Sequence, residues 1–259
     1  MIWTIQPRSK IANLAVIAAG HGPLVVLLHG VGLRSEAWSP IITDLAENYR
    51  ILAVDLPGHG ESEFQGPYSR ICDYAQALLP LLQGPCALIG HSMGALIALE
   101  LARRYPDVVW SVAALNAVFE RSPDAMAAVQ ARAAALEDRS VSDPTSTLLR
   151  WFGTNPSAER AACSDWLSSV DPKGYKSAYT VFASVSGVPR EALKQIKCPS
   201  LFLTGEQEPN STPAMSKEMA ALAPHGRAEV VPDAGHMMPM THARSVAQIL
   251  VPFLQETLG

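Results

Sequence analysis

Short apolar runs bounded by glycine or proline constrain the fold of this chain more than any other feature of its sequence. Leu24–Leu28 and Cys86–Ile89 are continuously apolar and have the length of strands rather than of helices. Runs of this kind are typical of parallel strands that are buried on both faces of a sheet. Because such runs alternate with helical segments along the chain, the sequence predicts an α/β fold with a mostly parallel, doubly wound sheet.

The expected strands and helices follow this alternation. Strands are expected at Leu24–Leu28, Ile51–Asp55, Cys86–Ile89, Trp110–Leu115, Pro199–Thr204 and Ala228–Val231. Helices are expected at Trp38–Asn48, Ile71–Leu82, the segment from the turn at Gly94 to Arg104, Thr212–Leu222 and His242–Leu258. Alternating polar and apolar residues at Ile2–Gln6 and Leu14–Ala18 predict an antiparallel hairpin before the first parallel strand.

The alternation stops between residues 117 and 194, where helix-favouring segments follow one another. These segments are Pro123–Arg139, Pro144–Phe152 and Glu159–Ser169. We therefore expect a core formed by residues 1–116 and 195–259, with a helical insertion at residues 117–194. Nine basic and nine acidic residues lie between Glu120 and Lys194, so the composition of the insertion favours no charged substrate.

The composition of the whole chain argues against several classes of protein. Of its 259 residues, 48% are hydrophobic and 17% are charged, which excludes an intrinsically disordered protein. The formal net charge is −4 and no basic cluster is present, so nucleic acid is not an expected partner. The four cysteines have no CxxC or metal-ligand spacing, so we expect free thiols in a reducing compartment.

Two segments without charged residues are long enough to cross a bilayer, one between Lys10 and Arg34 and the other between Asp73 and Glu100. Glycine and proline interrupt both segments, so a spanning helix could not easily satisfy its backbone hydrogen bonds. The N-terminal residues lack a basic region followed by an apolar stretch, which argues against a signal peptide. The sequence therefore predicts a soluble, cytoplasmic protein with no membrane partner.

The strongest chemical signal is the pattern G-x-S-x-G at residues 90–94, directly after an apolar strand and directly before a helix. A sharp strand-to-helix turn strains the backbone of the central residue, and a Cβ atom at Gly90 or Gly94 would collide with neighbouring groups. The turn exposes the hydroxyl of Ser92 beside a helix N-terminus, whose free N–H groups favour developing negative charge. Ser92 is therefore the candidate nucleophile.

A nucleophilic serine needs a general base. His236 follows the last predicted strand, late in the chain, where the order with the nucleophile first places the base. We interpret His29 and His59 as structural loop histidines. Surface or loop positions are expected for His21, His225 and His242.

The third member of such a site orients the imidazole and stabilises its cationic form. Two carboxylates, Glu206 and Glu208, follow the strand expected at Pro199–Thr204. Glu208 is the preferred candidate for the acid. The alternatives are Glu206, closer to the end of the same strand, and Glu120, which follows the preceding strand of the sheet.

The developing oxyanion of an acyl-transfer reaction needs hydrogen-bond donors. The backbone N–H of Met93, just after the candidate nucleophile, is one candidate. The second is expected in the loop after Leu24–Leu28, where the Val31 N–H is preferred and the Gly32 N–H is the alternative. Glycines at positions 30 and 32 allow this loop to approach a substrate closely.

Together these motifs resemble the α/β-hydrolase superfamily, and in particular its compact capped esterases, enol-lactonases and cofactor-free haloperoxidase-like enzymes. The matching segments are His29-Gly30-Val31-Gly32, Asp55–Ser62, Gly90–Gly94, Gly205–Pro209 and Ala234-Gly235-His236. The resemblance covers nearly the whole chain and implies the α/β-hydrolase fold, with the helical insertion as a cap over Ser92. One departure is that most such relatives carry aspartate where this chain has Glu208.

The expected function is hydrolysis of a small carboxylic ester or lactone through an acyl-enzyme on Ser92, with His236 as base and Glu208 as acid. Some of the seven aromatic side chains between residues 117 and 190 are expected to line an apolar pocket. No metal or organic cofactor is expected, because the chain lacks the H-E-x-x-H, P-loop and G-x-G-x-x-G patterns. The sequence favours no particular oligomeric state.

Three other functions remain open. The first is a C–C bond hydrolase of ring-cleavage diketones, whose members often carry tryptophan after the catalytic histidine, where this chain has Met237, and an arginine beside the site. The sequence identifies no such arginine. The second is another reaction on the same fold, such as amide hydrolysis or a lyase reaction, and the third is a non-catalytic ligand receptor.

Overall fold

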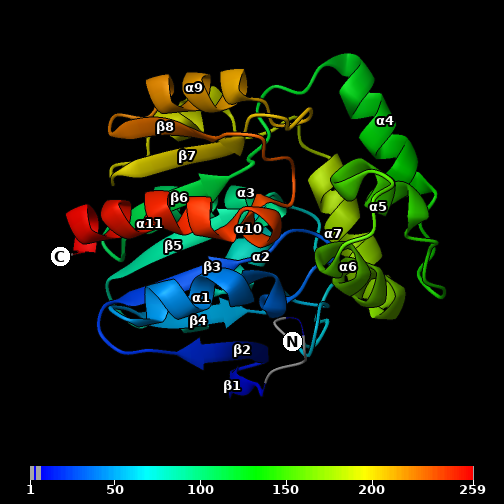
Figure 1. The fold of residues 1–259 in the computed structure, drawn as a ribbon, viewed down its shortest axis with the longest axis horizontal. Coiled ribbons are helices and arrows are strands. Elements are labelled where there is room, and N and C mark those ends of the chain that lie inside the picture. Colours follow the sequence, from blue (N-terminus) through cyan, green and yellow to red (C-terminus); the bar gives the residue numbers. More distant parts are fainter. Residues whose placement is uncertain (1–2, 4–6, 259) are drawn as a thin grey trace.

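An eight-stranded sheet lies at the centre of the computed structural model, which describes residue 3 and residues 7–258 (Figure 1). Its strands lie in the order β1-β2-β4-β3-β5-β6-β7-β8. They are β1 (Ser9–Ile11), β2 (Leu14–Ala19), β3 (Leu24–Leu28), β4 (Arg50–Val54), β5 (Cys86–His91), β6 (Val109–Leu115), β7 (Ser200–Gly205) and β8 (Gly226–Val231). All pairs from β4 to β8 are parallel, whereas β2 pairs antiparallel with both β1 and β4. The predicted mostly parallel sheet is confirmed.

The predicted N-terminal hairpin is described only in part. Of its first segment, Ile2 and residues 4–6 lie outside the described residues. Its second segment corresponds to β2, whose hairpin partner in the described chain is β1.

Helices cover both faces of the sheet. The helical elements of the core are η1 (Ser35–Trp38), α1 (Ser39–Ala46), α2 (Ile71–Ala77), η2 (Leu79–Leu81), α3 (Met93–Arg104), α8 (Arg190–Lys194), α9 (Pro213–Leu222), α10 (Met238–Thr241) and α11 (Ala243–Leu258). Successive strand residues point to opposite faces, so two hydrophobic cores result. Val25 and Leu27 of β3 pack with α1 and α11, while Leu24, Val26 and Leu28 pack with α2, α3 and α9 on the other face.

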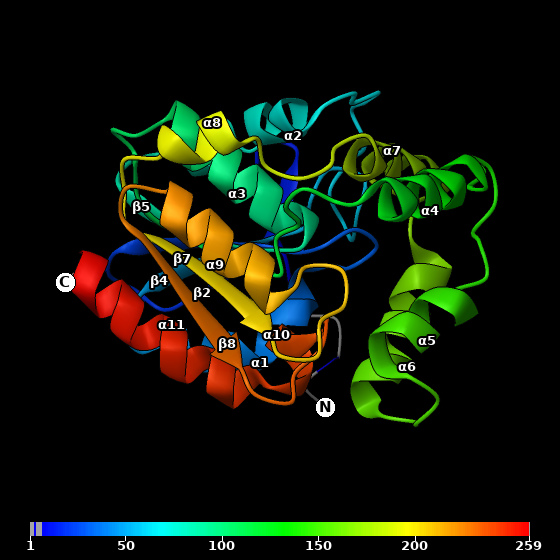
Figure 2. The same cartoon turned by 90° about the horizontal axis from the view of Figure 1, so that it is seen from above.

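Four further helices lie between β6 and β7 in the chain. They are α4 (Pro123–Ala134), α5 (Thr145–Phe152), α6 (Ala158–Ser169) and α7 (Pro172–Ala183). Figures 1 and 2 show them together beside the sheet, at the ends where the parallel strands finish. Helix α8 instead packs against α3 and α9 of the core. The division of the chain at residues 117 and 194 stays a prediction.

Two of the differences between the predicted and the observed helices can be traced to the local sequence. The helix expected at Ile71–Leu82 ends at Ala77 and continues as the short η2, because Pro80 has no N–H to donate. Helix α7 was not predicted, although its start carries a recognisable signal. Asp171 accepts a hydrogen bond from the Gly174 N–H (2.7 Å) and Pro172 occupies the first helical position.

All four cysteines are described and carry free thiols. Within the described residues, no helix combines the length and the apolar character that crossing a membrane would require.

Candidate active site

Ser92 occupies a strained turn between β5 and α3. Its backbone φ is +56° and its ψ is −116°, a conformation that costs a non-glycine residue about 1–3 kcal/mol. A Cβ atom at Gly90 would collide with the Gly94 carbonyl oxygen, and one at Gly94 would collide with the Leu28 carbonyl oxygen. Both glycines of the G-x-S-x-G pattern are therefore required by close backbone approach.

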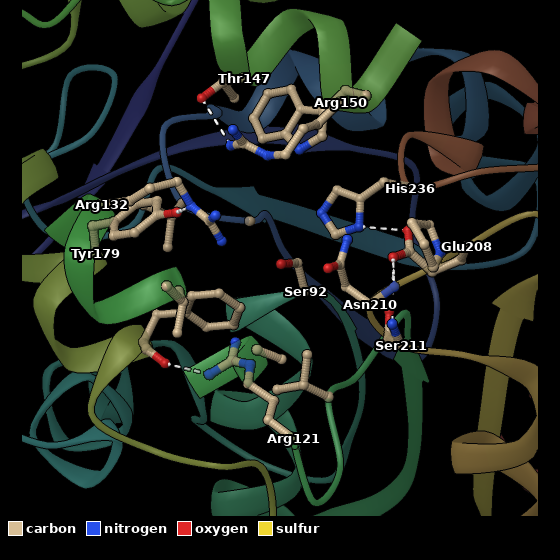
Figure 3. A pocket seen from close by; sticks show the side chains of 18 of the residues that line it. Ser92, Arg121, Arg132, Thr147, Arg150, Tyr179, Glu208, Asn210, Ser211 and His236 are labelled. Carbon is tan, nitrogen blue, oxygen red and sulfur yellow. Dashed lines mark hydrogen bonds and ion pairs between the residues drawn. The ribbon is translucent and has the colours of Figure 1, made fainter. Parts of the chain in front are cut away.

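His236 and Glu208 contact each other at the edge of a pocket that Ser92 also lines. His236 Nδ1–H donates to Glu208 Oε2 over 2.8 Å, and the Glu208 side chain is fully buried. Glu208 lies in the loop after β7 and His236 in the loop after β8, and these two strands are parallel neighbours. Ser92 and His236 line one pocket, which Figure 3 shows from close by.

The second oxygen of Glu208 is held by backbone donors. Its Oε1 accepts hydrogen bonds from the N–H groups of Asn210 (2.7 Å) and Ser211 (3.3 Å). Burial alone would raise the pKa of Glu208, but the adjacent His236 and these hydrogen bonds outweigh it and lower the pKa. An ionised carboxylate at Nδ1 fixes the tautomer of His236 that leaves Nε2 free to accept a proton.

No hydrogen bond joins the Ser92 hydroxyl to His236 among the described residues. In ligand-free serine hydrolases this contact is often long and tightens only when the substrate binds.

The alternative acids lie elsewhere. Glu206 is exposed and accepts a hydrogen bond from the Asp233 N–H (3.1 Å). Glu120 is exposed and pairs with Arg190, whose Nε lies 2.5 Å from Glu120 Oε1. Neither contacts His236 within residues 7–258, so Glu208 is the carboxylate that the fold brings to the histidine.

Of the two N–H groups expected as oxyanion donors in the loop after β3, one already has a hydrogen-bond acceptor in the protein. The Gly32 N–H donates to His59 Nε2 over 3.1 Å, so it is not free for a substrate. The N–H groups of Val31 and Met93 have no protein acceptor in the described part of the chain, and Val31 lines the pocket beside Ser92. The two preferred donors therefore remain candidates, and the alternative does not.

His29 and His59 brace the loop that carries Val31. His29 Nε2 accepts a hydrogen bond from the Leu56 N–H (2.9 Å), so the two imidazoles connect the loop after β3 to the loop after β4. Burial lowers the pKa of His29 to about 3 and that of His59 to about 4, so both rings are neutral.

The backbone of His236 is held by two side chains to which the sequence analysis gave no role. His91 Nε2–H and Asn116 Nδ2–H donate to the His236 carbonyl oxygen over 2.7 and 2.8 Å. Asn116 Oδ1 in turn accepts from the Gly205 N–H (3.2 Å) and the Thr204 hydroxyl (3.1 Å). Asn116 thus ties the ends of β6 and β7 to the histidine loop. A polar residue directly after an apolar strand is the signal that could have found it.

Three arginines of the pocket were also not predicted from the sequence. Arg121, Arg132 and Arg150 line it together with Ser92 and His236 (Figure 3). The segment between Glu120 and Lys194 has equal numbers of basic and acidic residues, so its composition indicates no excess of positive charge. The acidic residues of that segment do not line the pocket, whereas these three arginines do. The sequence identified no arginine beside the site, and the structure places these three there.

Aromatic side chains of the insertion form part of the pocket wall, as expected. They are Trp151, Tyr175, Tyr179 and Phe182. The Trp151 ring is nearly parallel to the His236 ring, with centroids 5.9 Å apart and an interplanar angle of 22°. The wall is only partly apolar, because the guanidinium groups lie among these rings.

Among the described residues, no group of three or more His, Cys, Asp or Glu side chains has an arrangement suited to a metal ion. A serine hydroxyl, an imidazole and a carboxylate are the kinds of group that nucleophilic catalysis with proton transfer uses.

Comparison with known proteins places the chain in a family. Residues 25–249 match the model of the alpha/beta hydrolase family. The (E)-2-((N-methylformamido)methylene)succinate hydrolase of Acinetobacter baylyi is 37% identical over 246 residues, which are 92% of each chain. The pimeloyl-[acyl-carrier protein] methyl ester esterase of Xanthomonas oryzae is 30% identical over 91% of this chain and 96% of its own.

A solved structure of similar shape is that of a thermophilic esterase from Thermogutta terrifontis, with malate bound. It has a TM-score of 0.87 and 26% identity, and the match covers 98% of this chain and 100% of the other. The chain therefore belongs to the alpha/beta hydrolase family and is a hydrolase.

Proposed function

We propose that this hydrolase cleaves an ester or lactone of a small carboxylic acid through an acyl-enzyme on Ser92. The observation that carries the proposal is the 2.8 Å contact between His236 and the buried Glu208, at the pocket that Ser92 lines from its strained turn. The esterases among the similar proteins support it.

The proposed reaction has two halves. In the first, Ser92 Oγ attacks the carbonyl carbon while His236 Nε2 takes the hydroxyl proton, and the N–H groups of Val31 and Met93 stabilise the oxyanion. The bond to the leaving oxygen then breaks, and His236 gives its proton to that oxygen. In the second half, water attacks the acyl carbon and gives a proton to His236. Release of the acid returns that proton to Ser92 Oγ.

A second candidate is hydrolysis of an N-acyl bond by the same residues. It is favoured by the relative at 37% identity, whose name describes an N-methylformamido compound. The steps are the same, except that His236 protonates a leaving nitrogen. C–C bond cleavage stays an alternative: its members often carry an arginine beside the site, as this chain does, but also tryptophan after the catalytic histidine, where this chain has Met237.

A labelling and turnover experiment tests the proposal. The purified protein is reacted with a fluorophosphonate probe and assayed with short acyl esters, lactones, N-acyl compounds and vinylogous diketones. We expect labelling at Ser92 and turnover of esters or lactones, both absent in Ser92→Ala. Ser168→Ala, which alters an exposed serine of α6, is the matched control. Turnover of the diketones alone, or ligand binding without any turnover, would contradict the proposal.

A further inference from the structure

The three arginines of the pocket carry positive charge that no carboxylate of the described chain neutralises. Arg121 Nη1 donates to the carbonyl oxygens of Phe182 (2.9 Å) and Val185 (2.6 Å). In the described chain this guanidinium therefore donates to neutral acceptors, and its carbon lies 4.2 Å from the centroid of the Phe182 ring.

The other two guanidinium groups are also held by neutral oxygens. Arg132 Nε donates to the Tyr179 hydroxyl over 3.0 Å. Arg150 Nη2 donates to the Thr147 hydroxyl (3.0 Å) and its Nη1 to the Ser146 carbonyl oxygen (3.2 Å). Each contact orients a guanidinium without offsetting its charge.

The one acid in the pocket wall is already committed. Glu208 is the only carboxylate among the lining residues, and its two oxygens accept from His236 and from two backbone N–H groups. Three positive charges therefore share a partly buried pocket whose one lining carboxylate is bonded to other groups.

Bringing three like charges into one pocket is unfavourable by itself. Burial, with a further contribution from the like charge of Arg132, lowers the pKa of Arg121 to about 10. Burial and Arg132 also lower the pKa of Arg150, partly opposed by Tyr179. Arg121 and Arg132 are half-buried and Arg150 is exposed, so a bound anion would offset both the partial burial and the mutual repulsion of these charges.

The positions of the arginines favour two separate anionic groups. In Figure 3, Arg121 and Arg150 lie on opposite sides of Ser92, and Arg132 lies between them. One carboxylate is saturated by one or two guanidinium groups, since each guanidinium offers a fork of two parallel donors. A single phosphate would require the three groups to converge on one point instead.

The free space of the pocket limits the size of its occupant. Within the pocket, the centres of water molecules can occupy a volume of about 100 Å³. A cavity that holds one water molecule needs roughly 10–15 Å³ by the same measure. This space suits a small molecule.

We infer that the substrate is a small dicarboxylate: an acyl compound whose two carboxylates bind Arg121, Arg132 and Arg150 while its reactive carbonyl lies at Ser92. Arg121 and Arg150 each bind one carboxylate and Arg132 is shared between them. The position of the carbonyl rests on the proposed function, but the anion site does not.

Binding to an inactive protein tests the anion site without turnover. Ser92→Ala is titrated calorimetrically with succinate, with butyrate, which has the same chain length and one carboxylate, and with inorganic phosphate. We expect succinate to bind at least about tenfold more tightly than either, as loss of a charge-assisted contact predicts. Butyrate or phosphate binding as tightly as succinate would overturn the inference.

Arginine variants in the same Ser92→Ala background locate the site. Arg132→Gln, Arg150→Gln and Arg121→Lys should each weaken succinate binding by about 10- to 100-fold. Arg121→Lys keeps the charge, so that the anchor to Phe182 and Val185 is not lost entirely, and thermal unfolding checks that each variant is folded. Arg139→Gln, an exposed arginine beyond α4, is the matched control. Unchanged succinate binding in all three folded variants would overturn the inference.

Turnover separates this inference from the proposed function. Methyl butyrate, monomethyl succinate and the monomethyl ester of tricarballylic acid carry zero, one and two carboxylates beside the ester. We expect kcat/KM to rise with each carboxylate, by about tenfold or more. Equal turnover of all three would overturn the dicarboxylate site and leave the ester hydrolase standing. Tight succinate binding without ester turnover would support the site and refute the ester hydrolase.

Discussion

The core and the insertion supply the pocket with different kinds of residue. Ser92, Glu208 and His236 lie in turns and loops that follow β5, β7 and β8. The arginines come from α4, from α5 and from the segment before α4. Residues that follow neighbouring parallel strands are brought to one edge by the sheet itself, whereas residues on helices meet only if the helices pack in one particular way.

The two groups also differ in how they are held. The His236 carbonyl oxygen receives two side-chain donors and Glu208 receives two backbone donors, which fixes their positions. The guanidinium groups instead donate to neutral oxygens: Arg121 and Arg150 to two each, and Arg132 to the Tyr179 hydroxyl. Under the proposed function the core provides the chemistry and the insertion selects the substrate, so changes in the two regions should affect kcat and KM differently.

The largest change in kinetics that distinguishes the two regions is expected from a substitution in the core. Glu208→Gln should lower kcat by about 10²–10⁴-fold, because His236 loses the carboxylate that orients it. Glu208→Asp should keep part of the activity, limited by its shorter reach. Glu206→Gln and Glu120→Gln serve as controls, each expected within about tenfold of the parent by steady-state kinetics. A severe loss in Glu120→Gln with normal activity in Glu208→Gln would reverse the assignment.

Changes in the insertion should act mainly on binding. Arg150→Gln should raise KM by about 10- to 100-fold for a dicarboxylate ester and lower kcat much less, because a remote contact holds substrate and transition state alike. The KM for a neutral ester should stay within a few-fold. A fall in kcat alone, with KM unchanged, would place Arg150 with the catalytic residues instead.

A smaller loss of kcat is expected when a side chain that holds the loop of His236 is changed. Asn116→Ala removes one of the two donors to the His236 carbonyl oxygen and should lower kcat by about tenfold, since small misplacements of a catalytic group reduce the rate. Asn116→Asp cannot donate this hydrogen bond and should behave similarly. Leu149→Ala, at an exposed position of α5, should leave kcat unchanged. An unchanged kcat in both Asn116 variants would show that His91 suffices to hold the loop.

The smallest effect is expected in the pH dependence of stability. Because the pKa of Glu208 is lowered in the folded protein, the ionised carboxylate stabilises the fold above its ordinary pKa. This contribution is lost as the pH falls from about 4.5 towards the lowered value. Denaturant unfolding of the parent and of Glu208→Gln should therefore show a stability difference at pH 7 that shrinks below pH 4. A difference that grows on acidification would contradict the direction of the shift.

The local pattern of the sequence determined the sheet and the order of the candidate catalytic residues. Apolar runs with strand length report burial on both faces, and G-x-S-x-G specifies its own turn because Gly90 and Gly94 have no room for a side chain. Glu208 and His236 could be predicted because each follows a strand, and neighbouring strands determine which loops meet. These are short-range properties, which a sequence records directly.

The tertiary structure alone decided which charges enter the pocket. Arg121, Arg132 and Arg150 lie among nine basic and nine acidic residues of the insertion, and nothing in their local sequence separates them from Arg139, which does not line the pocket. Whether they line the same pocket depends on the rotation and packing of α4, α5 and α7. The bracing of His236 by Asn116 likewise joins groups 120 residues apart. Such contacts are set by how elements pack in three dimensions, which composition and periodicity do not record.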